Sequence, residues 1–160
     1  TLKTGSFKAT KVDRSLRANL VGDVLPVAKG IKKNVKLVDI RSADEYSGKI
    51  FAPAGFQELA VRAGHIPGAE NIAWGLNVNS DGTFKTVAEL KKLYADKGID
   101  GSKAIITYCR IGERSSLTWF VLSEILGYND VKNYDGSWTE YGNSVGAPIS
   151  NPAGTIWGSL

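Results

Sequence analysis

The feature that most constrains the fold of this chain is a repeated alternation of short apolar, β-branched runs with segments of helical spacing. The runs predict strands over 35–40, 70–73, 104–108 and 131–134, and the segments between or after them predict helices over 42–46, 86–96, 116–126 and 137–144. Helical connections of this kind join parallel strands and cover the sheet they form. We therefore expect an α/β fold whose central, mostly parallel sheet has helices on both faces.

Local signals mark some of the element ends. Thr86 stands three residues before Glu89, a spacing typical of a capping box at a helix start. Residues 79–82 read as a turn that ends in glycine. Residues 48–68 contain two prolines and several glycines, which predicts a long loop with one helical turn near 57–60. Loops of this length in a compact domain are often functional.

Length and composition bound the domain organisation. A chain of 160 residues with 42% hydrophobic and 22% charged residues is typical of one globular domain. Residues 1–30 show no sustained period and are predicted to be an irregular lead-in segment, with a former interdomain linker as one interpretation. The domain is expected over 31–150, followed by a C-terminal tail over 151–160. Because the chain starts at Thr1 and contains no methionine, we interpret it as a processed product or a piece of a longer protein.

The charge pattern and the single cysteine narrow the classes of partner. The net charge of +4 comes from lysines and arginines scattered along the chain, which argues against nucleic acid and fits a small anionic substrate. No apolar run approaches the roughly 20 residues that span a bilayer, so no membrane segment is expected. One cysteine allows neither an internal disulfide nor a thiolate metal cluster. A reduced thiol favours the cytoplasm, with the periplasm as the alternative.

Cys109 lies where an α/β fold places its chemistry. It follows the strand predicted over 104–108, and the loop from Arg110 to Arg114 leads to a helix predicted to start near Ser115. Ligands of open α/β sheets bind at the carboxyl ends of the strands, and amides at a helix start hold anions. The same amides and the two arginines favour a thiolate, which is the nucleophilic form of cysteine. Gly112 permits the tight turn that such a loop needs.

The competing interpretation is that Cys109 is an inert residue at the end of a buried strand. Free cysteines are usually buried and behave as small apolar side chains. Two arginines and a glycine between a strand and a helix start are unusual surroundings for an inert thiol, so the reactive interpretation is favoured.

Four segments together resemble the rhodanese family. They are Leu37-Val-Asp-Ile-Arg41 with Asp44-Glu-Tyr46, Ala63-Gly-His-Ile-Pro-Gly-Ala69, the loop Cys109-Arg-Ile-Gly-Glu-Arg114, and Asn133-Tyr-Asp-Gly-Ser-Trp138. Each is weak alone, but their order and separation match the family. The chain resembles the catalytic C-terminal half of two-domain thiosulfate sulfurtransferases, and the resemblance implies a missing N-terminal rhodanese-like domain as a partner.

The resemblance implies a reaction in two steps. Thiosulfate donates its outer sulfur to Cys109, sulfite leaves, and the resulting persulfide passes that sulfur to cyanide or a thiol. No metal and no organic cofactor is implied. The implied partners are therefore a small anionic sulfur donor and a thiophilic acceptor.

The resemblance also assigns roles around Cys109. Arg110 and Arg114, with the backbone of Ile111, Gly112, Glu113 and Ser115, would bind the donor anion. Asp39 and Arg41 would support the loop from the neighbouring strand end, with a plain structural ion pair as the alternative. Two positions depart from the vertebrate thiosulfate-using members, which have basic residues where this chain has Ile111 and Glu45. The donor site is therefore expected to be less basic here, and thiosulfate remains the first choice of donor.

Three further residues carry a functional and a structural interpretation. His65 could act as a base, but it lies in a glycine- and proline-rich turn, where hydrogen bonding to nearby backbone is favoured. Trp74 and Trp138 could wall the pocket or fill the core, and the core interpretation is favoured because aromatic side chains bury large areas.

Two other functions stay open. A cysteine-dependent phosphatase or arsenate reductase also holds a thiolate at a helix start, but such phosphatases have one more residue between cysteine and arginine than the four found here. A non-catalytic binding or regulatory module of rhodanese-like fold is the second alternative. Such modules usually lack the cysteine that this chain retains.

Overall fold

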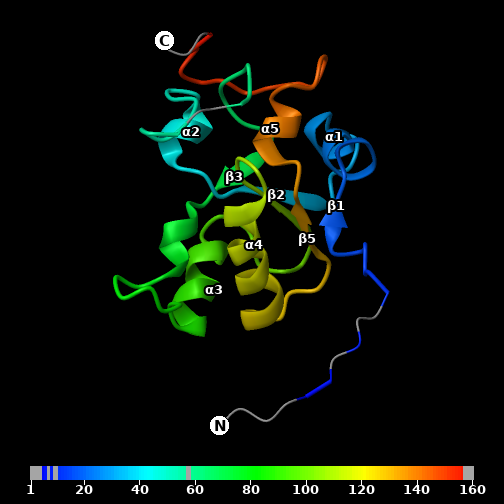
Figure 1. Cartoon of the computed structure of the whole chain (residues 1–160), viewed down its shortest axis with the longest axis vertical. Coiled ribbons are helices and arrows are strands. Elements are labelled where there is room, and N and C mark those ends of the chain that lie inside the picture. The colour runs from blue at the N-terminus through cyan, green and yellow to red at the C-terminus, as the bar shows by residue number, and fades with distance from the viewer. Residues whose placement is uncertain (1–4, 7, 9–10, 57–58, 157–160) are drawn as a thin grey trace.

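The computed structural model describes residues 5–6, 8, 11–56 and 59–156. Their strands form one five-stranded sheet in the order β1-β5-β4-β2-β3, and every pairing is parallel (Figure 1). The strands are β1 Arg17–Ala18, β2 Val35–Asp39, β3 Ala69–Asn71, β4 Ala104–Tyr108 and β5 Val131–Tyr134. The predicted α/β class and the parallel sheet are confirmed.

Helices cover both faces of this sheet. They are α1 Leu25–Ala28, α2 Ala43–Ser47, α3 Val87–Ala95, α4 Glu113–Phe120 and α5 Ser137–Tyr141, with wider or tighter helical turns η1 Leu20–Val24, η2 Trp74–Asn77 and η3 Val121–Ile125. Figure 1 shows α3 and α4 on one side of the sheet and α1, α2 and α5 on the other. Within the described residues, no helix combines the length and apolar character needed to cross a membrane.

The core is divided by the sheet into two clusters, because successive side chains of a strand point to opposite faces. Leu37 and Ile106 belong to the cluster that contains Trp138 and Tyr141 of α5. Their neighbours Val38 and Ile105 belong to the cluster under α3 and η3. Nearly continuous apolar strands of this kind are what a sheet covered on both faces requires.

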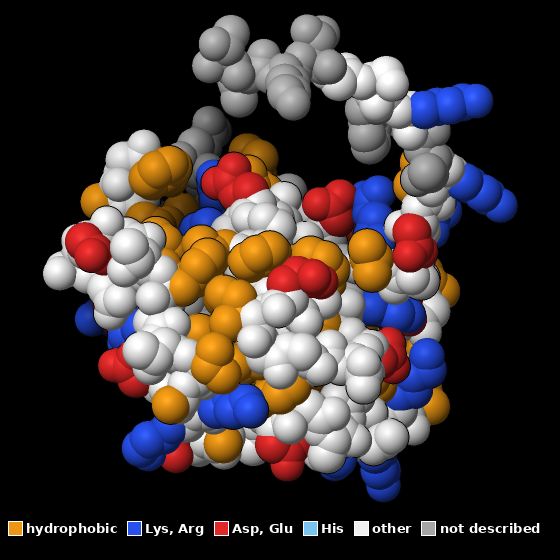
Figure 2. All heavy atoms as spheres, turned by 90° about the horizontal axis from the view of Figure 1, so that it is seen from below, with side chains coloured by type: hydrophobic (Ala, Val, Ile, Leu, Met, Phe, Trp, Pro, Cys, Tyr) orange, Lys and Arg blue, Asp and Glu red, His pale blue; other side chains and the backbone are white. Residues whose placement is uncertain are grey.

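The surface agrees with the scattered charge of the sequence. On the face shown in Figure 2, apolar side chains form a band, while lysines and arginines alternate with acidic side chains around it. The positive charge is therefore not gathered into one patch on this face.

The N-terminal region is more ordered than the sequence suggests. The expected irregularity over 1–30 is wrong for residues 17–28, which form β1, η1 and α1. Arg17 pairs with Asn133, and the side chains of Ala18 and Val24 are buried. A two-residue strand is too short to show a period, and its pairing depends on β5, which lies more than a hundred residues away in the chain.

The remaining local predictions are confirmed in part. The capping box of Thr86 and Glu89 is present at the start of α3. In the loop over 48–68, the helical turn expected near 57–60 falls partly outside the described residues, and Leu59 and Ala60 are not helical. Residues 151–156 of the expected tail are tied to the domain, since the Ala153 amide donates to the Ser47 carbonyl at 2.9 Å.

Candidate active site

Cys109 lies between the end of β4 and the start of α4, at the carboxyl ends of the parallel strands. Its side chain is fully buried. The helix begins at Glu113, earlier than the predicted start near Ser115, because Gly112 adopts a left-handed backbone angle of φ 89° and serves as the cap. The first helical turn is polar, so apolar periodicity does not reveal it. Glu113, Arg114 and Ser115 therefore belong to the helix rather than to the loop before it.

The loop curls around the cysteine sulfur. The Gly112 amide donates a hydrogen bond to Cys109 Sγ at 3.1 Å. The Gly112 carbonyl accepts from Ser115 Oγ at 3.0 Å and from Asn133 Nδ2 at 3.1 Å, which fixes the orientation of the following peptide, between Gly112 and Glu113. An amide that donates to sulfur stabilises a negative charge on that atom, so the geometry suits a thiolate or any other sulfur anion.

Helix α5 holds the other side of the loop. The amides of Trp138 and Thr139 donate to the carbonyls of Cys109 and Arg110 at 3.0 and 2.9 Å. Ser137 Oγ accepts from the Cys109 amide at 3.0 Å and lies 2.8 Å from the Tyr134 carbonyl, to which it donates. Its separation from Cys109 Sγ is 3.9 Å, so the sulfur is the more distant acceptor for this hydroxyl. No sequence pattern around Ser137 predicts this role.

The predicted donor-binding residues differ in their burial and in their contacts. Ser115 is buried and its hydroxyl is used within the loop, whereas Ile111 and Glu113 are exposed. The Arg110 guanidinium lies 5.8 Å from the centre of the Phe56 ring, over the long loop that follows α2. Arg114 is half-buried and pairs with Glu45, with Nη2 3.2 Å from Oε1. The two arginines thus have different surroundings.

Glu45, which in the sequence stands only as a departure from a basic residue, has a defined partner in the structure. Its carboxylate is buried, and besides Arg114 it accepts hydrogen bonds from the amide and hydroxyl of Ser42 at 3.0 Å. Burial alone would raise the pKa of Glu45, but the hydrogen bonds from Arg114 and Ser42 outweigh it and hold the pKa below its ordinary value. Glu45 is therefore ionised at neutral pH. Its partner lies 69 residues away in the chain, which is why only the fold reveals the pair.

Asp39 and Arg41 form a fully buried ion pair, with Arg41 Nη2 2.6 Å from Asp39 Oδ2. Burial alone lowers the pKa of Arg41, and the neighbouring Asp39 carboxylate raises it above its ordinary value overall. The Arg41 guanidinium also donates to the Gly64 carbonyl at 2.8 Å and lies 4.6 Å from the Trp138 ring. It also lies 5.9 Å from the centre of the ring of Tyr108, the residue before Cys109, and the Trp138 amide donates to the Cys109 carbonyl.

The other three candidates, Trp74, Trp138 and His65, differ in burial and in their contacts. Trp138 is 1% exposed and donates from its indole to the Arg62 carbonyl, whereas Trp74 is 40% exposed and does not fit the core interpretation. His65 Nδ1 lies 2.7 Å from the Tyr46 carbonyl and its ring stacks on the Tyr46 ring. Burial lowers the pKa of His65, so the ring is neutral at neutral pH. These contacts agree with the structural interpretation of His65.

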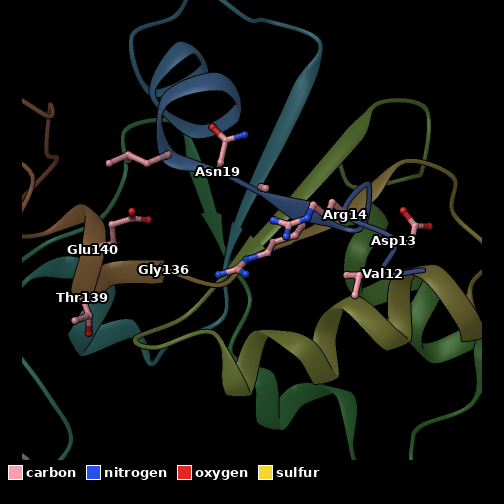
Figure 3. Close-up of a pocket in the computed structure, with 10 residues that line it drawn as sticks. Val12, Asp13, Arg14, Asn19, Gly136, Thr139 and Glu140 are labelled. Atoms are coloured by element: carbon pink, nitrogen blue, oxygen red, sulfur yellow. The ribbon is translucent and has the colours of Figure 1, made fainter. Parts of the chain in front are cut away.

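A cleft of about 750 Å³ opens beside α5, between this helix and the segment that leads into η1. Figure 3 shows Asn19 of that segment and Thr139 and Glu140 of α5 among the residues around it. Cys109 does not line this cleft, so the cleft is separate from the sulfur site. Among the described residues, no cluster of three or more histidine, cysteine or acidic side chains could hold a metal ion.

Gly112→Ala is expected to lower the free energy of unfolding by about 2 kcal/mol, because a Cβ atom there would meet the Asp135 carbonyl oxygen at 2.6 Å in addition to the left-handed backbone strain. Gly127→Ala is the matched control, since Gly127 has a φ of 69° with open space around it. The control should lose only about 1 kcal/mol. Chemical denaturation measures both, and equal losses would show that the Asp135 contact is unimportant.

Comparisons with known proteins point to one family. The sequence model of the rhodanese-like domain matches residues 26–144. A protein from Mycolicibacterium smegmatis named a putative thiosulfate sulfurtransferase is 59% identical over 145 residues, which are 90% of this chain and 50% of that protein. The sulfur carrier protein TtuD from Thermus thermophilus is 51% identical over 150 residues, 91% of this chain and 52% of that protein. The chain thus spans about half the length of these relatives.

A solved structure agrees with the sequence comparisons. The structure of EanB carrying a cysteine persulfide, bound to ergothioneine, matches with a TM-score of 0.70 and 27% identity, covering 84% of this chain and 32% of that one.

Proposed function

The chain belongs to the rhodanese-like domain family, and from that premise we propose that it is a sulfurtransferase that carries sulfur as a persulfide on Cys109. The observation that carries the proposal is the hydrogen bond from the Gly112 amide to the buried Cys109 sulfur at the start of α4. Relatives named as a putative thiosulfate sulfurtransferase and a sulfur carrier protein support it. The proposed donor is thiosulfate and the proposed acceptors are cyanide or a thiol.

The proposed loading step is a displacement at sulfur. The Cys109 thiolate attacks the outer sulfur of thiosulfate, the bond between the two sulfur atoms of thiosulfate breaks, and sulfite leaves with the bonding electron pair. The new persulfide carries one negative charge, as the thiolate did, but on its outer sulfur, one bond further from the Gly112 amide that donates to Cys109 Sγ. The net charge at Cys109 is therefore the same before and after loading.

The proposed unloading step restores the thiolate. Cyanide attacks the outer sulfur of the persulfide, the bond between the two sulfur atoms breaks, and thiocyanate leaves. A thiolate acceptor would take the same sulfur and become a persulfide itself. The name of the Thermus thermophilus relative favours this second acceptor class, because a sulfur carrier hands sulfur to another molecule.

The test is an intact-mass measurement on the purified chain incubated with thiosulfate and then with cyanide. We expect a gain of roughly 32 Da that peptide mapping places on Cys109 and that cyanide removes as thiocyanate. Loading by another persulfide but not by thiosulfate would change the donor and keep the class. Failure of every donor to load the chain would favour the non-catalytic binding module.

A further inference from the structure

The Glu45 carboxylate lies where it offsets the positive charge of Arg114. The side chain projects from α2, is 1% exposed, and both of its carboxylate oxygens face the Arg114 guanidinium, at 3.2 and 3.4 Å. The Ser42 amide and hydroxyl donate to the same carboxylate, so its position is fixed independently of Arg114. A buried carboxylate with this many donors stays ionised and in place.

Arg114 links this carboxylate to the sulfur. Burial alone would lower the pKa of Arg114, but its hydrogen bond to Glu45, the Glu45 charge and, to a smaller extent, the Cys109 side chain raise it overall. The guanidinium is therefore charged and lies within electrostatic range of both groups. The Arg114 charge therefore interacts with the Glu45 carboxylate and with any anion that binds next to Cys109.

Paired charges in this region alternate in sign. Asp39 pairs with Arg41, Glu45 with Arg114, and Arg41 also acts electrostatically on Glu45. The two acidic and two basic groups sum to zero, so the Glu45 carboxylate cancels the positive charge that Arg114 would otherwise offer to a donor. Because the Coulomb energy scales with the product of the two charges, the Glu45 carboxylate opposes a donor with two negative charges more strongly than a donor with one.

We propose that Glu45 is a specificity-determining residue of sulfur loading: by pairing with Arg114 it disfavours donors that carry two negative charges relative to donors that carry one. This inference rests on the proposed sulfurtransferase function. Thiosulfate is the dianionic probe and 3-mercaptopyruvate, with one carboxylate, is the monoanionic probe. In the latter reaction the Cys109 thiolate takes the thiol sulfur, the carbon–sulfur bond breaks, and the thiol proton ends on the methyl carbon of pyruvate.

The experiment compares the ratio of kcat/KM for thiosulfate to kcat/KM for 3-mercaptopyruvate in the wild-type chain and in Glu45→Gln. Glutamine keeps the size of the side chain and can still accept from Ser42, but it removes the negative charge. We expect the ratio to rise about tenfold in the variant. Because both donors are measured on one preparation, a fraction of unfolded protein cancels in the ratio.

Asp44→Asn is the matched control, because it removes an equal charge from the same helix at a side chain that is 53% exposed and paired with Lys49. Its ratio should stay within about twofold of wild type, since solvent screens exposed charges. If Glu45→Gln does not fold, Glu45→Asp replaces it: the shorter carboxylate holds Arg114 less closely, and a smaller rise in the ratio is expected. An unchanged ratio in the folded variant, or an equal rise in Asp44→Asn, overturns the inference alone. Failure of the wild-type chain to load with either donor overturns the proposed function instead.

Discussion

Cys109→Ser is expected to lower thiocyanate formation by about 10⁴-fold or more, because a serine hydroxyl is not ionised near neutral pH and cannot form a persulfide. Serine is nearly equal in size to cysteine, and its oxygen can accept the hydrogen bond that the Gly112 amide now donates to Cys109 Sγ. The fold should therefore be retained while the reaction is lost. The rate of thiocyanate release from thiosulfate and cyanide measures the effect.

The matched control for this loss is Ser116→Ala. Ser116 is exposed on α4, and its hydroxyl donates to the Glu113 carbonyl rather than to the sulfur. This variant should retain a rate within about twofold of wild type, as surface substitutions usually do. Persistent sulfur loading in Cys109→Ser would place the transferred sulfur on a different group and refute the assignment of the nucleophile.

Arg41→Met is expected to reduce the free energy of unfolding by about 3–5 kcal/mol, because it leaves the fully buried Asp39 carboxylate without its partner. The Gly64 carbonyl would also lose the hydrogen bond that Arg41 donates at 2.8 Å. A loss of this size is a large fraction of the stability of an ordinary domain. Urea denaturation followed by tryptophan fluorescence measures it, since Trp138 packs against Arg41.

Two comparisons test the cause of this loss. Arg17→Met removes an exposed pair, Arg17 with Asp135 at 2.7 Å, and should cost no more than about 1 kcal/mol. The double variant Asp39→Asn with Arg41→Met removes the unpaired charge, so it should recover part of the stability lost in the single variant. A double variant no more stable than the single one would show that the Arg41 contacts with Gly64 and Trp138 matter more than the charge on Asp39.

The parts of the fold that the sequence predicts are those determined by neighbouring residues. The strands over 104–108 and 131–134 were predicted with the bounds that the structure gives, because they are short apolar runs between turn residues. The capping box of Thr86 and Glu89 depends on residues three positions apart and is also confirmed. The position of Cys109 after a buried strand follows from the same local patterns.

The parts that the sequence misses depend on contacts between distant segments. In the sequence Glu45 is only a departure from a basic residue, and its pairing with Arg114 appears when the fold brings α2 and α4 together. Ser137 supports the Cys109 amide from the start of α5, although a serine after a glycine carries no such signal in the chain. Donor specificity therefore depends on information that only the folded arrangement supplies.

Strand β1 has a consequence for how the domain can be delimited. The family match covers residues 26–144, so a protein cut to that range would begin inside α1, without the pairing of Arg17 and Ala18 to β5. Such a cut would make β5 an unprotected sheet border, open to pairing with other chains. It would also discard the reciprocal backbone bonds of Ser150 with His65. The range matched by the family model is therefore shorter than the range that folds as one unit. A minimal expression clone should include β1 and the residues around Ser150.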